Sequence, residues 1–238
     1  MSSAMRAQAR RACERDIMDV DSFIDRYFPK ERSAETLRPT EQELDEIRNL
    51  TVNRGEYRSN MEWLLSKAVD RGYLLRGSPY LTEILQPYDY LGHGISAITT
   101  ASYNQTISGV YASEYPQEAL IYSFFRKYEV TPGLLLWGMV GDLVDPVYFM
   151  SNAVWEKRCG LGYIYVCPGD GFEKLPVSET RHTYVNRAEV KPACIIPVKF
   201  EDFKHEIFVA GNNFHVDFML PRRIHKMIEE KKKARECA

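Results

Sequence analysis

The chain has 238 residues, 45% of them hydrophobic, which is enough for a buried core that needs no disulfide or metal ion to hold it together. Its formal net charge of -2 lacks the basic surplus of most nucleic-acid-binding proteins, so a nucleic-acid partner is not indicated. No run approaches the roughly 18 apolar residues that span a bilayer, and the charged N-terminal stretch is unlike a secretory signal, so we predict a cytoplasmic protein without a membrane partner.

The first predicted element is a helix from about Ser3 to Phe28. Its apolar residues recur at three- and four-residue spacing and form one stripe, which is typical of a helix with a single buried face. Pro29 ends the pattern, because proline lacks the N–H that a helix interior needs. The stretch from Pro29 to Pro39 has the composition of a linker.

Two shorter helices that begin with capping boxes are predicted next. Thr40 stands three residues before Glu43, so each side chain can accept a hydrogen bond from the backbone N–H of the other residue. Ser59 and Glu62 have the same spacing at the start of the second of these helices. We expect that helix to end near Gly72, since glycine is common just past a helix C-terminus.

Beyond Gly72 the pattern changes to strands separated by glycine and proline. The predicted strands are Tyr73–Arg76, Gly109–Ala112, Leu134–Val140, Gly162–Cys167 and Cys194–Phe200. A helix is predicted from Pro116 to Phe124, and a basic helix begins at Pro221. We therefore predict an α+β protein in which a helical N-terminal region, residues 1–72, precedes a strand-rich core with a C-terminal helix, residues 73–238.

The five cysteines and five histidines give no sign of a disulfide framework or a metal centre. The cysteines are odd in number, widely scattered and without a Cys-x-x-Cys pair, which is typical of a reducing compartment. The histidines lack the i, i+4 spacing of a helical zinc motif and do not cluster with cysteines. We predict that the protein holds no metal.

The most informative segment is the end of the first strand, Tyr73–Pro79. There an apolar strand ends in a cation, Arg76, followed by two small residues, Gly77 and Ser78. A strand end places the guanidinium at the mouth of the sheet, and the small residues let a planar or phosphorylated ligand approach the backbone closely. The alternative interpretation is an ordinary strand exit with a surface arginine.

Three motifs in this order resemble those of the ADP-ribosyltransferase superfamily, which includes the tRNA 2′-phosphotransferases. Leu75–Ser78 is similar to the strand of these families that ends in His-Gly or Arg-Gly and a small residue. Val110–Ser113, followed by the helix Pro116–Phe124, is similar to their next strand and alanine-containing helix. Val190–Pro192, which follows Tyr184–Asn186, resembles the entry to their late strand, and a set of uncharacterised bacterial proteins shares the first and last motifs.

The resemblance covers roughly Tyr73 to Phe203 and implies a split-sheet core that binds NAD as its substrate. Arg76 would contact the ribose or diphosphate of the dinucleotide, and Gly77, next to Ser78, would hold the carboxamide through its backbone. The protein would then transfer ADP-ribose to an acceptor macromolecule. The helical N-terminus and most of the middle of the chain, from 128 to 156, lie outside the resemblance.

Two further residues would complete the NAD pocket. Tyr111 could stack on the nicotinamide ring, although a tyrosine in a strand is also typical of half-buried packing. Ser113 could add a polar contact, or cap the helix that follows it.

Cleavage of the nicotinamide–ribose bond builds positive charge on the sugar, so the reaction needs a carboxylate close to the ribose. Glu189, just before the Val-Lys-Pro element, is the first candidate, and Glu179 is the second. Each of the two is also consistent with a solvated glutamate in a turn.

Two alternative functions remain open from the sequence. One is a catalytically inactive binding or interaction module that keeps the cleft of the same fold. The other is an RNA 2′-phosphotransferase-like enzyme, in which arginines and a histidine would hold an RNA phosphate. The residues available for that role are Arg76, Arg181, His182 and Arg187.

Overall fold

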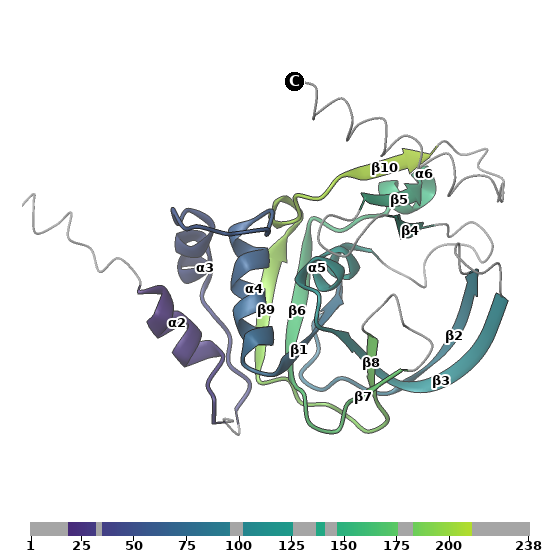
Figure 1. Ribbon diagram of the computed structural model, residues 1–238, viewed down its shortest axis with the longest axis horizontal. Coiled ribbons are helices and arrows are strands. Elements are labelled where there is room, and N and C mark those ends of the chain that lie inside the picture. The colour runs from purple at the N-terminus through teal and green to yellow at the C-terminus, as the bar shows by residue number, and fades with distance from the viewer. Residues whose placement is uncertain are drawn as a thin grey trace, which may run out of the picture.

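The computed structural model describes residues 19–31, 35–95, 102–125, 137–140, 147–175 and 183–210. Its helices are α2 (Val20–Tyr27), α3 (Glu41–Arg48), α4 (Asn60–Asp70), α5 (Pro116–Phe124), α6 (Asn152–Glu156) and the 3-10 helix η1 (Phe200–Asp202). Its strands are β1 (Tyr73–Ser78), β2 (Tyr88–Ile95), β3 (Ser102–Ser113), β4 (Trp137–Val140), β5 (Val147–Ser151), β6 (Leu161–Pro168), β7 (Glu173–Lys174), β8 (Thr183–Asn186), β9 (Cys194–Lys199) and β10 (Ile207–Ala210). These helices and a largely antiparallel sheet, seen in Figure 1, confirm the predicted α+β class.

The predicted N-terminal helices are present where the structure describes them. α2 begins after Asp19, whose side chain caps it, and the earlier part of this predicted helix, from Ser3, lies outside the described residues. The predicted basic helix from Pro221 also lies outside them. α3 has the predicted capping box, because the side chains of Thr40 and Glu43 each accept a hydrogen bond from the other residue's N–H.

α4 begins with only half of its predicted capping box. The hydroxyl of Ser59 accepts a hydrogen bond from the N–H of Glu62 at 3.1 Å, as expected. The carboxylate of Glu62 instead accepts from the N–H of Arg58 at 3.0 Å and contacts the ring of His205. A partner that is distant in the sequence therefore determines where this carboxylate points.

Seven strands form the main sheet, and all of its paired strands run antiparallel. The order is β7-β8-β3-β1-β6-β9, with β2 paired to the first part of β3. β1 pairs with β6 along its whole length but with β3 only at Leu75↔Ser113. Figure 1 shows β2 and β3 curving away from the rest of the sheet. A second sheet of three strands has the order β10-β5-β4, with β10 parallel to β5.

The main core lies between the sheet and the helices that cover one of its faces. α2, α3, α4 and α5 supply buried apolar side chains that pack with those of β1, β6 and β9. α5 lies so close to the sheet that a Cβ atom on Gly77 would stand 1.8 Å from the carbonyl oxygen of Ala119. A Cβ atom on Gly162 would stand 2.3 Å from the carbonyl oxygen of Ser123. The two glycines thus form the notch in which α5 lies.

A smaller apolar cluster covers the opposite face of the sheet. Its buried members are Leu85, Val110, Tyr165, Cys167, Val190 and Ile195. Leu85 and Val190 belong to different loops and exchange two backbone hydrogen bonds, of 2.9 and 3.0 Å. Burial raises the pKa of the Cys167 thiol to about 12, so this cysteine stays protonated and acts as an apolar core residue.

The helical N-terminal region is joined to the sheet through backbone contacts. Leu37 forms a parallel bridge with Cys194 of β9. The hydroxyl of Thr36 donates to the carbonyl oxygen of Pro192 at 2.9 Å. The stretch predicted as a linker therefore covers part of the edge of the sheet, and the helices share their core with the strands.

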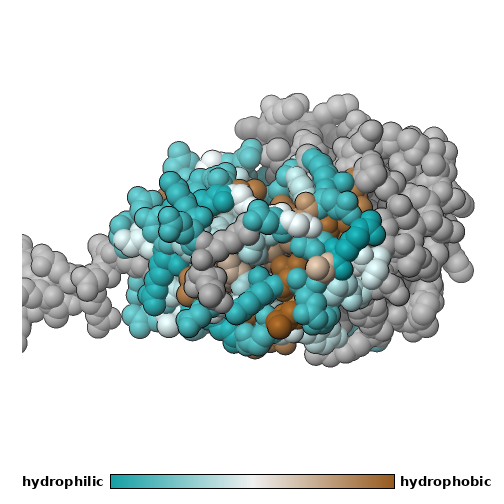
Figure 2. Space-filling model, turned by 90° about the horizontal axis from the view of Figure 1, so that it is seen from below, coloured by the Kyte–Doolittle hydropathy of each residue, from teal (hydrophilic) through white to brown (hydrophobic). Residues whose placement is uncertain are grey.

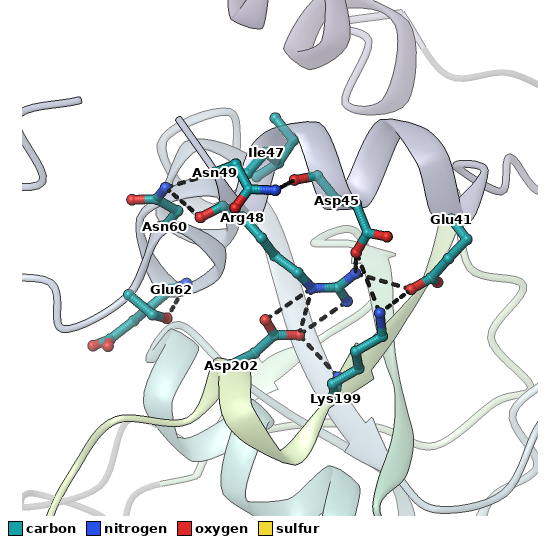
Figure 3. A network of polar contacts seen from close by, with 10 residues as sticks. Glu41, Asp45, Ile47, Arg48, Asn49, Asn60, Glu62, Lys199 and Asp202 are labelled. Carbon is teal, nitrogen blue, oxygen red and sulfur yellow. Dashed lines mark hydrogen bonds and ion pairs between the residues drawn. The ribbon is translucent and has the colours of Figure 1, made fainter. Parts of the chain in front are cut away.

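A network of charged side chains ties α3 to the end of β9 (Figure 3). Nε of Arg48 lies 3.0 Å from the carboxylate of Asp202, and Nη1 lies 2.8 Å from that of Asp45. Lys199 also pairs with Asp45, at 3.2 Å, and with Glu41. Although burial opposes the charge of Arg48, its bonds to Asp202 and Asp45 raise the pKa of the guanidinium. This network fixes the helical region on the sheet at a second place.

The described part of the face seen in Figure 2 is mainly hydrophilic. Seen from below, a broken strip of hydrophobic residues crosses it (Figure 2). Among the described residues no helix is both long enough and apolar enough to cross a membrane. Within the same ranges, no three histidine, cysteine, aspartate or glutamate side chains gather as metal ligands would.

Candidate functional site

Arg76 lies where strands β1 and β3 separate. The two strands pair only at Leu75↔Ser113, one residue before Arg76. Nη1 of Arg76 donates a hydrogen bond to the carbonyl oxygen of Tyr111 at 3.1 Å, across the point of separation. In a paired part of the sheet a backbone N–H of the neighbouring strand would donate to such a carbonyl oxygen. Here the guanidinium of Arg76 donates in its place.

Two tyrosine rings lie beside this guanidinium. The Cζ atom of Arg76 is 5.2 Å from the centre of the Tyr88 ring, which is within the range of a cation–π interaction. The rings of Tyr88 and Tyr111 are 5.7 Å apart and tilted by 57°. The structure therefore brings together two of the predicted residues, Arg76 and Tyr111, and adds Tyr88 to them.

The Nε atom of Arg76 is buried and has no hydrogen-bond partner within the described residues. A buried N–H group without a partner costs about 1–3 kcal/mol. An oxygen of a phosphate, carboxylate or carbonyl group would satisfy it, and a charged donor favours an anionic oxygen most. The guanidinium thus has the capacity to bind an anionic ligand.

Tyr165 of β6 stands next to Arg76 in the register of the sheet and anchors the segment that follows β1. Its hydroxyl accepts a hydrogen bond from the N–H of Thr82 at 2.9 Å and donates one to the carbonyl oxygen of Tyr80. Burial raises the pKa of the Tyr165 phenol, against the opposing effects of the Thr82 N–H and the Arg76 charge. The hydroxyl therefore stays protonated and keeps both hydrogen bonds.

Gly77 faces α5 rather than the side of the sheet that carries Arg76. Because the carbonyl oxygen of Ala119 fills the position of a Cβ atom, helix packing explains the glycine at this position. The hydroxyl of Ser78 accepts a hydrogen bond from the N–H of Tyr80 at 3.1 Å, so it shapes the turn after the strand. Neither residue needs a ligand to account for its identity.

Ser113 is buried at the end of β3, three residues before the first residue of α5. Its hydroxyl donates to the carboxylate of Glu118 at 2.7 Å and accepts from the N–H of Tyr115 at 3.1 Å. These two bonds tie the end of β3 to the first turn of α5, but Ser113 does not cap this helix, because the N-cap residue is Tyr115 and α5 has no side-chain capping bond.

Glu189 is exposed in the loop after β8, and Glu179 lies outside the described residues. Within the described part of the chain Glu189 forms no ion pair or side-chain hydrogen bond. Its neighbour Val190 is bound through two backbone hydrogen bonds to Leu85, in the segment between Arg76 and Tyr88. The backbone next to Glu189 is therefore fixed beside that segment, while its side chain faces solvent.

Of the further residues considered for an RNA phosphate, the structure describes one and leaves two undescribed. Arg187 pairs with Glu173 at 2.8 Å on the surface, and both side chains are exposed. Arg181 and His182 lie outside the described residues. Of these three residues only Arg187 is described, and its guanidinium pairs with Glu173.

Sequence reasoning missed Tyr88 and Tyr165. Tyr88 opens β2 directly after a proline, which indicates the start of an element but not its neighbours. Tyr165 lies in a run of apolar and aromatic residues that correctly predicted a strand. Which of these rings approaches Arg76 depends on the register of β1 with β6 and on the path of the segment 79–87, and neither leaves a local pattern.

The chain was compared with protein families, curated proteins and solved structures. No family model matches it, and no curated protein or solved structure matches it significantly. The likeness of three motifs to those of the ADP-ribosyltransferase superfamily therefore stays a prediction from the sequence.

Proposed function

We propose that the chain is a NAD-binding, ADP-ribosyltransferase-like protein that transfers ADP-ribose from NAD to a macromolecule. The observation that carries this proposal is the guanidinium of Arg76, which has a buried Nε without a partner among the described residues and stands beside two tyrosine rings. NAD offers matching chemistry, namely a diphosphate for the cation and a flat nicotinamide ring for an aromatic wall.

The contacts of Arg76 favour a role in binding. Its hydrogen bond to the carbonyl oxygen of Tyr111 and its contact with the ring of Tyr88 hold the guanidinium in one orientation. A donor fixed in this way loses little conformational entropy when an anion binds to it. In this proposal Arg76 contacts the ribose or diphosphate of NAD, and the ring of Tyr111 stacks on the nicotinamide ring.

The transfer step needs a carboxylate. The bond between the nicotinamide nitrogen and ribose C1′ breaks, nicotinamide leaves as a neutral molecule, and positive charge develops on the ribose. A nucleophile of the acceptor bonds to C1′ and gives up its proton to water. We assign the stabilising carboxylate to Glu189, because its backbone is fixed beside the segment that joins Arg76 to Tyr88.

A thermal-shift titration with NAD, followed by an assay for released nicotinamide, tests the proposal. We expect saturable stabilisation of the wild type, since a ligand that binds only the folded state stabilises it by about 2.7 kcal/mol at a hundred times its Kd. Arg76→Ala should lose this shift, whereas the control Arg158→Ala, at an arginine that packs on Trp155, should keep it. Absence of a shift with the wild type at millimolar NAD would contradict the proposal.

The assignment of Glu189 is tested by turnover. Glu189→Gln should keep the thermal shift with NAD but release nicotinamide at least a hundredfold more slowly, because the neutral amide cannot balance the charge on the ribose. Glu173→Gln, which alters an exposed glutamate that pairs with Arg187, is the matched control and should release nicotinamide at the wild-type rate. Equal rates in both variants would remove Glu189 from the mechanism.

One observation favours the second candidate, a binding module without turnover. Within the described residues no group orients the carboxylate of Glu189, which is exposed. Catalytic carboxylates are usually held in place by neighbouring groups. Saturable binding of NAD without any release of nicotinamide by the wild type would identify the protein as a binding module.

A further inference from the structure

Three large apolar side chains are exposed in the segment 79–87, which joins β1 to β2. Tyr80, Leu81 and Ile84 are 47%, 48% and 41% exposed. Among the described residues only two other large hydrophobic side chains are exposed to a comparable degree, namely Tyr122 of α5 and Leu161 at the start of β6. We call the group formed by Tyr80, Leu81 and Ile84 the apolar loop surface.

The backbone of this segment is held in place at several points. The hydroxyl of Tyr165 binds both the carbonyl oxygen of Tyr80 and the N–H of Thr82. The hydroxyl of Thr82 donates to the carbonyl oxygen of Ile84 at 2.9 Å, and Leu85 is bridged to Val190. A surface with a fixed backbone loses little entropy when a partner binds, which is a property of preorganised recognition surfaces.

The apolar loop surface is adjacent to the site proposed for NAD. The segment starts after Ser78, two residues beyond Arg76, and it ends at Tyr88. The bridge from Leu85 to Val190 brings the residue next to Glu189 against the same segment. A partner that lies on this surface would thus contact a segment that starts close to the proposed cation and is bridged to the residue next to the proposed carboxylate.

The charges around this surface favour a polypeptide over a nucleic acid. Arg38 forms an ion pair with Glu83 of the segment itself. Lys191, an exposed cation one residue after Val190, lies two residues from the exposed Glu189. Since a nucleic acid needs an excess of positive charge to bind its phosphates, a surface with balanced charge and exposed apolar groups fits a protein better.

We infer that the apolar loop surface is the docking site for a protein acceptor of ADP-ribose, which presents an apolar side chain close to the residue that is modified. This inference rests on the proposed function, because it names the class of acceptor for the same site. Leu81 and Ile84 supply the apolar contact. Because the backbone of the segment 79–87 is fixed, it sets the distance from the docked side chain to the reacting ribose.

Binding of labelled peptides, measured by fluorescence anisotropy without NAD, tests the inference independently of turnover. Each probe is a twelve-residue peptide that contains serine, arginine, glutamate and cysteine as potential acceptors. In the apolar set these residues are flanked by leucine and isoleucine. In the second set they are flanked by serine. We expect the wild type to bind the apolar set about tenfold more tightly or better, because burial of two aliphatic side chains supplies at least that difference.

The variant Leu81→Ser/Ile84→Ser should lose this preference. Tyr122→Ser is the matched control, since Tyr122 is 36% exposed on α5, and it should bind both peptide sets as the wild type does. Thermal melting of each variant without ligand checks that the fold is intact. Equal affinity of the wild type for the two sets, or an unchanged preference in the double variant, would overturn the inference, as would tighter binding of single-stranded RNA.

Nicotinamide release measured in parallel separates this inference from the proposed function. We expect the double variant to release nicotinamide into water at the wild-type rate, but to transfer labelled ADP-ribose to the apolar peptides about tenfold more slowly. If the peptide preference is found and depends on Leu81 and Ile84 while NAD is never consumed, the docking surface stands and the transferase proposal fails. If NAD is consumed without any peptide preference, the docking surface fails and the transferase proposal stands.

Discussion

Nε2 of His205 lies 3.0 Å from Oε1 of Glu62, and their side chains are 0% and 3% exposed. The two residues are 143 positions apart and connect α4 to the segment that leads into β10. The His205 ring also lies beside the rings of Tyr148 and Phe203. A polar contact therefore holds the C-terminal part of the described chain against a helix of the N-terminal region.

Loss of this contact should destabilise the protein. Glu62→Gln places an amide between His205 and the N–H of Arg58, so one buried polar group loses its partner, and we expect the free energy of unfolding to fall by about 1–3 kcal/mol. Urea denaturation at neutral pH measures the change. Glu56→Gln, at an exposed glutamate, is the control, and an equally small effect in both variants would show that the pair contributes nothing.

Gly77→Ala should be more harmful than an alanine at an open glycine. The new Cβ atom would stand 1.8 Å from the carbonyl oxygen of Ala119 and 2.7 Å from the backbone nitrogen of Ser123, so α5 would have to move. We expect destabilisation of about 1–3 kcal/mol or more. Gly160→Ala has no atom within 4 Å of the new Cβ, and it should leave the thermal midpoint almost unchanged. Equal midpoints for the two variants would mean that α5 does not need this notch.

Tyr88 should support NAD binding through its ring. Tyr88→Leu removes the cation–π contact with Arg76, which is worth about 0.5–2 kcal/mol, so the Kd for NAD should rise by roughly two- to thirtyfold. Tyr88→Phe keeps the ring and should bind NAD much as the wild type does. Isothermal titration measures both values, and a larger loss in Tyr88→Phe than in Tyr88→Leu would point to the hydroxyl instead.

Glu43 should make the stability of the protein sensitive to acid. Burial alone would raise its pKa, but the hydrogen bonds from Thr40 and Tyr27 outweigh this and hold the pKa of the carboxyl below its ordinary value of 4.5. A carboxyl with a lowered pKa stabilises the folded state above that ordinary value, and the contribution is lost as the pH falls through the lower, folded-state pKa.

The effect is measured as the urea midpoint of the wild type and of Glu43→Gln between about pH 6 and pH 3. We expect the variant to be less stable near pH 6 and the difference between the two proteins to shrink as the pH falls below about 4.5. A difference that stays constant over this range would mean that the ionised carboxylate of Glu43 is not what stabilises the start of α3.

The order and type of many elements could be predicted from the sequence, because the signals that specify them are local. The capping box of α3 depends on two residues three positions apart, and Pro116 at the start of α5 needs only its own fixed backbone angle. The strands β1, β6 and β9 follow from short apolar runs. Five strands were not predicted, namely β2, β5, β7, β8 and β10, and β3 is longer than predicted, since the predicted strand Gly109–Ala112 covers only its last part.

The sequence by itself thus determined the α+β class, where helices begin, and that Arg76 stands near the end of a strand. The tertiary structure alone decided that Arg76 meets Tyr88 and Tyr111, that Gly77 faces α5, and that the carboxylate of Glu62 turns toward His205. Local hydrogen bonds and backbone preferences act over three or four residues, so they can be read along the chain. Contacts between distant residues depend on strand register and on the path of each loop, which are fixed only when the whole core packs.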